Sequence, residues 1–144
     1  MKSENLPELM FKLIPLIDHT FVRPVDIEFR TTATLTQVNI LSSLRDKDMT
    51  MKEISEYMTT SKQQMTLLIE KLVKKGFVIR KTSPDDRRII IIEITQAGLD
   101  LLDSIHAFSL SILDQRTKSM SMEDRKMLES AATQLLFLLE KYGY

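Results

Sequence analysis

The chain has 144 residues, of which 43% are hydrophobic and 28% charged, the balance of an ordinary globular domain. This length predicts one domain with a sizeable core. The absence of cysteine excludes disulfides, cysteine-based zinc sites and thiol catalysis. No apolar run reaches the roughly 18 residues of a membrane span, and the N-terminus is too polar for a signal peptide. We therefore expect a cytoplasmic protein.

The formal net charge is zero, but the charges are segregated along the chain. Residues 61–88 carry eight basic and three acidic side chains, a net charge of +5, whereas residues 93–144 carry five basic and eight acidic ones, a net charge of −3. A basic middle indicates a localised surface for a nucleic acid. A solvated charged face would explain the charge pattern alone equally well.

Helical periodicity dominates both ends of the chain. Apolar residues from Leu6 to Phe21 recur at three- and four-residue steps and predict a long amphipathic helix, which Pro15 and Pro24 should kink or interrupt. In the middle, residues 36–46 predict a second helix, with Thr36 as its N-cap.

Two short capping signals follow almost at once. Thr50 and Glu53 form a capping box that opens a short helix. Ser61 repeats the signal, with Gln64 at the reciprocal position, and Gly76 ends the helix that Ser61 opens. Two capped helices joined by a few residues are typical of a helix-turn-helix, whose second helix enters the major groove of DNA.

A β-hairpin is expected directly after this unit. Residues 77–82 and 87–95 are rich in β-branched side chains, and "SPDD" between them predicts a turn. The isoleucines of the second strand should anchor it against the helices. Two further helices follow, one capped by Thr95 and one beginning near Ser121. The predicted fold is mostly α with a small β-hairpin wing on a winged helix-turn-helix core.

The tip of the wing carries Asp86, Arg87 and Arg88. Arginine suits such a tip because the minor groove has a strongly negative potential and admits a thin, permanently charged side chain. On an extended strand Asp86 and Arg88 point the same way, so the carboxylate could hold the guanidinium in place. A solvated turn with mixed charges is the alternative.

The helix opened by Ser61 is expected to read DNA. Met65, Leu68, Ile69 and Leu72 form its buried stripe, which leaves Gln63, Thr66, Leu67, Glu70 and Lys74 on the opposite face. Glutamine can pair with adenine, so Gln63 and Gln64 are candidates for base reading. Ser61, Lys62, Thr66 and Lys71 are candidates for phosphate contacts. Leu67 either packs on a thymine methyl or packs against the second helix or the wing.

Residues 49–102 resemble the core of the multiple-antibiotic-resistance regulator (MarR) family of bacterial winged-helix repressors. The most specific match is the family's Asp-X-Arg, here Asp86 and Arg88, at a fixed distance before Ile94-Thr95. The segment "EKLVKKGFV" also resembles the family's passage from recognition helix to wing. The number of flanking helices extends the resemblance over essentially the whole chain. Leu67 departs from it, because many members have arginine there.

The resemblance implies an obligate homodimer, built from helices at about residues 1–32 and 96–144, around a DNA-binding lobe at about residues 35–95. It also implies a pseudo-palindromic DNA operator and, often, a small anionic or aromatic effector between the lobes. Interchain packing of the terminal helices is also what their apolar stripes favour. The expected interface residues are Leu9, Leu13, Ile112, Leu128, Leu135 and Leu139.

We therefore predict a dimeric transcriptional regulator, a repressor relieved by a small molecule. The runner-up is a winged helix that binds an acidic protein partner. An enzyme is disfavoured, because the sequence offers no nucleophile–base pair, metal-ligand cluster or phosphate loop. No cofactor or metal is expected. The sequence leaves open the operator, the effector and the choice between repression and activation.

Overall fold

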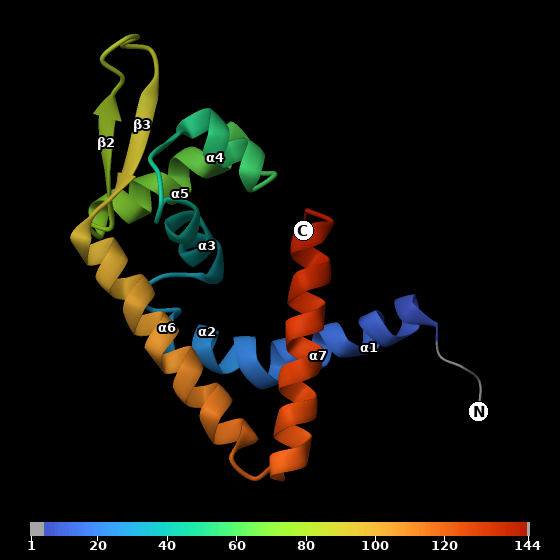
Figure 1. Ribbon diagram of the computed structural model, residues 1–144. Coiled ribbons are helices and arrows are strands. Elements are labelled where there is room, and N and C mark those ends of the chain that lie inside the picture. Colours follow the sequence, from blue (N-terminus) through green and yellow to red (C-terminus); the bar gives the residue numbers. More distant parts are fainter. Residues whose placement is uncertain (1–4, 144) are drawn as a thin grey trace. The chain divides into compact units, whose positions relative to one another are not determined.

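The computed structural model describes residues 5–143 (Figure 1). It is mostly helical with a small three-stranded antiparallel sheet, which confirms the predicted fold class. Two compact units divide the chain after Ser109. The elements are α1 (Leu6–Ile17), the π-helix η1 (Asp18–Val22), α2 (Arg23–Phe29), α3 (Leu35–Ser43), β1 (Met49–Thr50), α4 (Met51–Tyr57), α5 (Lys62–Lys74), β2 (Val78–Thr82), β3 (Ile90–Ile94), α6 (Gln96–Thr117) and α7 (Met122–Lys141).

The N-terminal helical segment is continuous but changes its winding. α1 passes through Pro15 and is followed by the wide turn of η1, in which Arg23 N–H bonds to the Asp18 carbonyl, five residues back. This turn lies directly before Pro24. A proline ring clashes with the carbonyl four residues earlier, here that of Thr20, and the wider winding relieves that contact. The predicted interruption therefore takes the form of a π-turn rather than a break.

The predicted N-caps of α4 and α5 are confirmed, although among the described residues the side chain of Gln64 makes no reciprocal bond to Ser61. Thr50 Oγ1 accepts from Glu53 N at 3.2 Å while Glu53 Oε2 accepts from Thr50 N at 2.7 Å, so both halves of the capping box form. Ser61 Oγ accepts from Gln64 N at 3.3 Å. At the other end of α5, Gly76 has a φ of +76°, the left-handed conformation that a side chain disfavours.

The predicted N-cap of α3 is wrong. The helix begins two residues earlier, with Thr34 as its N-cap instead of Thr36. Thr34 Oγ1 accepts from Gln37 N at 3.3 Å and Gln37 Oε1 accepts from Thr34 N at 3.0 Å. Thr36 lacks a glutamine or glutamate three residues later and cannot form this reciprocal pair.

The sheet has the order β1-β3-β2, and β1 is a strand that the sequence did not predict. β1 pairs only Met49 with Ile92 and Thr50 with Ile91. β3 begins at Ile90, three residues later than predicted. Ile92 is fully buried, but Ile89 and Ile90 are exposed, so the expectation that all the isoleucines anchor the strand is wrong.

The core lies within the lobe formed by α3, α4, α5, the sheet and the start of α6. Thr95 joins these parts: its N–H bonds to the Phe77 carbonyl at 3.0 Å, and its Oγ1 accepts from Gly98 N at 3.2 Å as the predicted cap of α6. A Cβ on Gly98 would lie 2.5 Å from the Phe77 carbonyl oxygen. Any residue other than glycine at position 98 would therefore clash with this oxygen, so glycine is what allows α6 to lie so close to the lobe.

Candidate nucleic-acid interface

α5 is held in the lobe by its predicted stripe. Met65, Ile69 and Leu72 are fully buried, and Leu68 packs against the same core. Because these residues recur on one face, the opposite face is turned to solvent. The exposed side chains of α5 include Lys62, Gln63, Gln64, Leu67, Glu70, Lys71 and Lys74.

Leu67 lies in the middle of this outward face and is 59% exposed. It does not take the packed position against the second helix or the wing that was the alternative for it. An apolar side chain at the centre of a polar surface can bury area only when another molecule covers it.

The hydroxyl groups of α5 differ in what they can donate. Ser61 Oγ accepts from Gln64 N, which leaves its own O–H free to donate outward. Thr66 Oγ1 instead donates to the Lys62 carbonyl at 2.9 Å. Of the two hydroxyl groups among the predicted phosphate contacts, that of Ser61 therefore needs no rearrangement, whereas that of Thr66 would have to break a bond within the helix.

A hollow of about 550 Å³ lies where α4, α5 and the wing meet. Its walls bring together three of the predicted site residues, Lys62, Thr66 and Arg88. Four basic residues and one acidic residue line it, a formal charge of +3. The lining residues are Thr50, Met51, Lys52, Ser55, Glu56, Lys62, Thr66, Arg80, Arg88, Ile89 and Ile90.

Lys52 and Arg80 were not among the predicted site residues. The sequence could have indicated Arg80. It lies two residues after the buried Val78, and strand side chains at this spacing share a face, so Arg80 should lie on the face of β2 that is turned to the helices. Lys52 on α4 gave no signal beyond its charge. The seven remaining predicted residues are exposed without lining the hollow: Ser61, Gln63, Gln64, Leu67 and Lys71 at or on α5, and Asp86 and Arg87 of the wing.

The wing tip differs from the predicted extended strand. Asp86 and Arg88 lie in the turn between β2 and β3, and Asp86 Oδ1 accepts from the backbone N–H of Arg88 at 2.9 Å. No ion pair joins their side chains within residues 5–143. The idea that the carboxylate holds the guanidinium is therefore wrong; it fixes the backbone from which the arginine projects.

Two further bonds define the same loop. Ile89 N donates to the Asp86 carbonyl at 3.0 Å, and Ser83 N donates to the Ile89 carbonyl at 2.9 Å. Nearer the base of the wing, Lys81 pairs with Glu93 across β2 and β3. The hydrogen bond that the Lys81 ammonium donates to the Glu93 carboxylate raises the pKa of Lys81. Backbone hydrogen bonds therefore close the tip of the wing, and the Lys81–Glu93 ion pair joins its two strands nearer the base.

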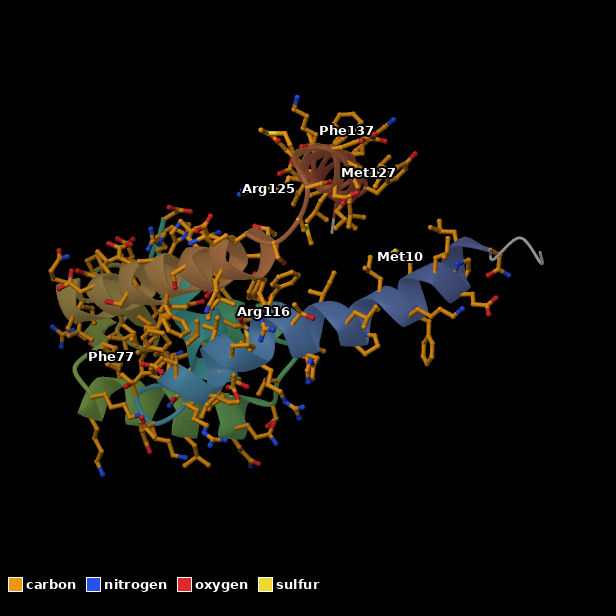
Figure 2. The ribbon with its side chains drawn as sticks, turned by 90° about the horizontal axis from the view of Figure 1, so that it is seen from below. Met10, Phe77, Arg116, Arg125, Met127 and Phe137 are labelled. Carbon is orange, nitrogen blue, oxygen red and sulfur yellow. The ribbon has the colours of Figure 1, made fainter. Side chains whose placement is uncertain are left out.

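The expected dimer residues are poorly covered in the single chain. Leu9, Leu13 and Leu128 are exposed, while Ile112, Leu135 and Leu139 are half-buried. α1 and α7 bury no residue in the described part of the chain. Figure 2 shows Met127 and Phe137 projecting from α7, where they are 66% and 62% exposed.

A second cavity, of about 200 Å³, lies beside the helical N-terminal segment. Its walls are Phe21, Val22, Val25, Asp26, Phe29, Ala33, Leu35, Val38, Ile105 and Ser109. The turn from Phe29 to Ala33 closes one side, where Ala33 N–H bonds to the Phe29 carbonyl at 2.9 Å. Lys75, at the C-terminal end of α5, donates from Nζ to the Thr32 carbonyl in this turn at 2.6 Å.

No helix within residues 5–143 combines the length and apolarity needed to cross a membrane. In the same described range, no group of three or more histidine, cysteine, aspartate or glutamate side chains could hold a metal ion.

The chain is similar to proteins of one family. A model described as "MarR family" matches residues 33–90. The HTH-type transcriptional regulator MhqR of Bacillus subtilis (strain 168) is 30% identical over 93 residues, which are 64% of this chain and 64% of that relative, slightly under two thirds of its length. The multiple antibiotic resistance protein MarR of Escherichia coli (strain K12) is 26% identical over 111 residues, 76% and 73% of the two chains.

Solved structures share the fold over nearly the whole chain. Wild-type MarR (apo form) from E. coli has a TM-score of 0.74 at 21% identity and covers 94% of this chain and 99% of its own. A mutant of MepR from S. aureus bound to an oligodeoxyribonucleotide has a TM-score of 0.69 at 18% identity, covering 90% and 97%. At sequence identities of 21% and 18%, these similarities show a shared fold only.

Proposed function

We propose that the chain is a member of the MarR family and, as such, a DNA-binding regulator of transcription rather than an enzyme. The observation that carries the proposal is the basic hollow between α4, α5 and the wing, with its formal charge of +3. Phosphate groups supply most of the affinity in protein–DNA complexes, and they require basic side chains gathered on one face.

In this proposal α5 enters the major groove and the wing lies along the neighbouring minor groove. Gln63, Gln64 and Leu67 would meet base edges, because they are exposed on the outward face of α5. Ser61, Lys62, Thr66 and Lys71 would contact phosphates. Arg88, supported by Arg87, would enter the minor groove from the wing, held by the backbone bond to Asp86.

We further propose a homodimer that binds a pseudo-palindromic operator. The support is the absence of any buried residue on α1 and α7 within the described chain, although both carry large apolar side chains. A two-fold dimer places two recognition helices about one helical turn of DNA apart. Leu9, Leu13, Ile112, Leu128, Leu135 and Leu139 would contribute to that interface. A DNA-bound regulator of this kind would act in the cytoplasm.

Regulation by a small molecule is supported by the cavity of about 200 Å³ and its connection to α5. The Lys75–Thr32 hydrogen bond joins the turn that borders the cavity to the end of the proposed recognition helix. A ligand that shifts this turn would therefore act on α5 directly. Binding there would be coupled to DNA binding, and the coupling would be reciprocal.

The test is a titration of labelled duplex DNA by the purified protein at several salt concentrations. If a dimer neutralises about 6–10 phosphates, affinity should fall by about 10³–10⁵-fold between about 50 and 200 mM salt. The duplexes come from the promoters of the source genome, with a scrambled duplex as the control. Failure to bind duplex at low salt would instead favour a protein–protein module whose basic hollow binds an acidic partner.

A further inference from the structure

The cavity beside η1 and α2 is apolar except at two places. Most of its lining side chains are aliphatic or aromatic, among them Phe21, Val25 and Phe29. Its side-chain polar groups are the Ser109 hydroxyl and the Asp26 carboxylate. Ser109 is already committed, because its hydroxyl donates to the Ile105 carbonyl at 2.8 Å. The carboxylate is therefore the group that distinguishes this cavity from a simple packing defect.

The side chain of Asp26 is unpaired among residues 5–143. Neither a hydrogen bond nor an ion pair involves its side chain within residues 5–143, although the residue is half-buried. Arg23 and Arg30 lie one turn away on either side along the same helical segment, yet both are exposed and neither pairs with it. A half-buried carboxylate without a partner favours a cation placed beside it, since burial makes an uncompensated charge costly.

We propose that this cavity binds a small aromatic or aliphatic cation, with Asp26 as the group that selects its charge. A volume of about 200 Å³ accommodates one ring with a short arm, since an apolar cavity of about 150 Å³ binds benzene. The ring lies among Phe21, Val25 and Phe29, and the ammonium group of the arm pairs with the carboxylate.

The family resemblance implied a small anionic or aromatic effector; the proposed ligand can share the aromatic ring but has the opposite charge to an anion. No basic side chain lines the cavity, so an anion would meet a carboxylate and no compensating cation. Such a cation would be the effector of the regulator proposed above, so the assignment rests on that proposed function. Its binding to the protein can nevertheless be measured without DNA.

The experiment uses three probes that share one ring: benzylamine, which is protonated at neutral pH, benzyl alcohol and benzoate. Each is titrated into the full-length protein, and chemical-shift changes give its dissociation constant. We expect benzylamine to bind at least about tenfold more tightly than benzyl alcohol, as for a hydrogen bond to a charged group. Benzoate should bind most weakly. Benzyl alcohol or benzoate binding as tightly as benzylamine would overturn the proposal, as would the absence of saturable binding.

Two variants test whether the preference for benzylamine depends on the Asp26 carboxylate. Asp26→Asn keeps the shape of the wall and removes its charge, so it should bind benzylamine and benzyl alcohol within about twofold of each other. Glu28→Gln makes the same charge change at an exposed position of α2 that does not line the cavity, and it should leave the preference intact. A preference that survives in Asp26→Asn, or is lost in Glu28→Gln, contradicts the assignment.

Duplex binding, measured in parallel without probe, separates the two proposals. A protein that binds duplex but shows no Asp26-dependent preference retains the proposed function and loses the cation site. A protein that shows the preference but binds no duplex retains the cation site and loses its role as an effector site for DNA binding.

Discussion

Arg88 is the wing residue whose proposed contact with DNA can be tested most directly. It is exposed at the tip and lines the basic hollow, so its side chain has little to contribute to the folded protein alone. We expect Arg88→Ala to weaken operator binding by about 1–3 kcal/mol and to change unfolding free energy by less than about 0.5 kcal/mol. Duplex titrations at fixed salt, with thermal unfolding as the control, test this. If Arg88→Ala bound the operator as tightly as the unmodified protein, the wing tip would be a solvated turn without a role in DNA binding.

Asp86 next to it offers a separate test, because its charge and its hydrogen bond can be removed in steps. Asp86→Asn removes the charge but retains an acceptor oxygen for Arg88 N–H, whereas Asp86→Ala removes both. Loss of a negative charge alone should tighten DNA binding equally in the two variants. If the bond positions Arg88, Asp86→Ala should bind more weakly than Asp86→Asn. Equal affinities would show that Asp86 acts only through its charge.

Leu67 makes a different prediction, because an apolar side chain discriminates by burial rather than by charge. If its exposed side chain packs on a thymine methyl, Leu67→Ala should cost about 1 kcal/mol of operator binding, the free energy of burying roughly one methylene. Replacing that thymine by deoxyuridine should cost a similar amount in the unmodified protein and almost nothing in Leu67→Ala. Two losses that simply add would place Leu67 away from the methyl.

At the scale of elements, the capping box of α4 should make stability depend on pH. The backbone N–H of Thr50 donates to Glu53, and this bond, with the contact to the Thr50 side chain, lowers the pKa of Glu53 from its ordinary 4.5. A lowered pKa contributes stability that is fully present above pH 4.5 and is lost as pH falls through the folded-state value.

Glu53→Gln should therefore destabilise the protein at neutral pH, and the difference from the unmodified protein should shrink below pH 4.5. Thr50→Ala removes the other half of the box and should cost about 1 kcal/mol. Urea unfolding at several pH values measures both. Glu56→Gln, in an exposed 3.9 Å pair with Lys52, is the matched control and should have little effect. A Glu53→Gln difference independent of pH would contradict the pKa assignment.

The same elements show which features a sequence reveals. Caps at Thr50, Ser61 and Gly76 were predictable because each depends on residues within one turn. The N-cap at Thr34 was equally predictable, because Gln37 lies three residues after it, but the prediction of Thr36 did not take Gln37 into account. β1 could not be predicted, since a two-residue strand exists only through its pairing with Ile91 and Ile92, some 40 residues away.

The candidate site likewise has features that the sequence predicts and features that depend on tertiary structure. The outward face of α5 followed from helical periodicity, which needs no tertiary information. The hollow did not, because it unites α4, α5 and the wing, and so Lys52 was missed. The sequence correctly placed Asp86, Arg87 and Arg88 in the hairpin but not their geometry, since the turn extends to Ile89 and Asp86 bonds to a backbone N–H instead of a side chain.

At the scale of the whole molecule, the terminal helices pose a solubility problem for a single chain. On α1, Phe11 is 79% exposed and Leu6 71%, and large apolar side chains are exposed along α7 as well. Soluble monomers rarely expose contiguous apolar surface of this kind. We therefore expect light scattering to give about twice the chain mass of 16.7 kDa at micromolar concentration.

Charged substitutions on α7 test where the proposed interface lies. Leu135 and Leu139 recur four residues apart on one face, so Leu135→Glu and Leu139→Glu would each place a charge in the interface without a partner. Each should shift the mass toward 16.7 kDa and weaken duplex binding, because one recognition helix alone contacts half the phosphates. Ser130→Glu adds the same charge on the opposite face of the helix and should leave a dimer. Circular dichroism distinguishes a folded monomer from an unfolded chain. A native protein that is already monomeric at that concentration would rule out the two half-site arrangement.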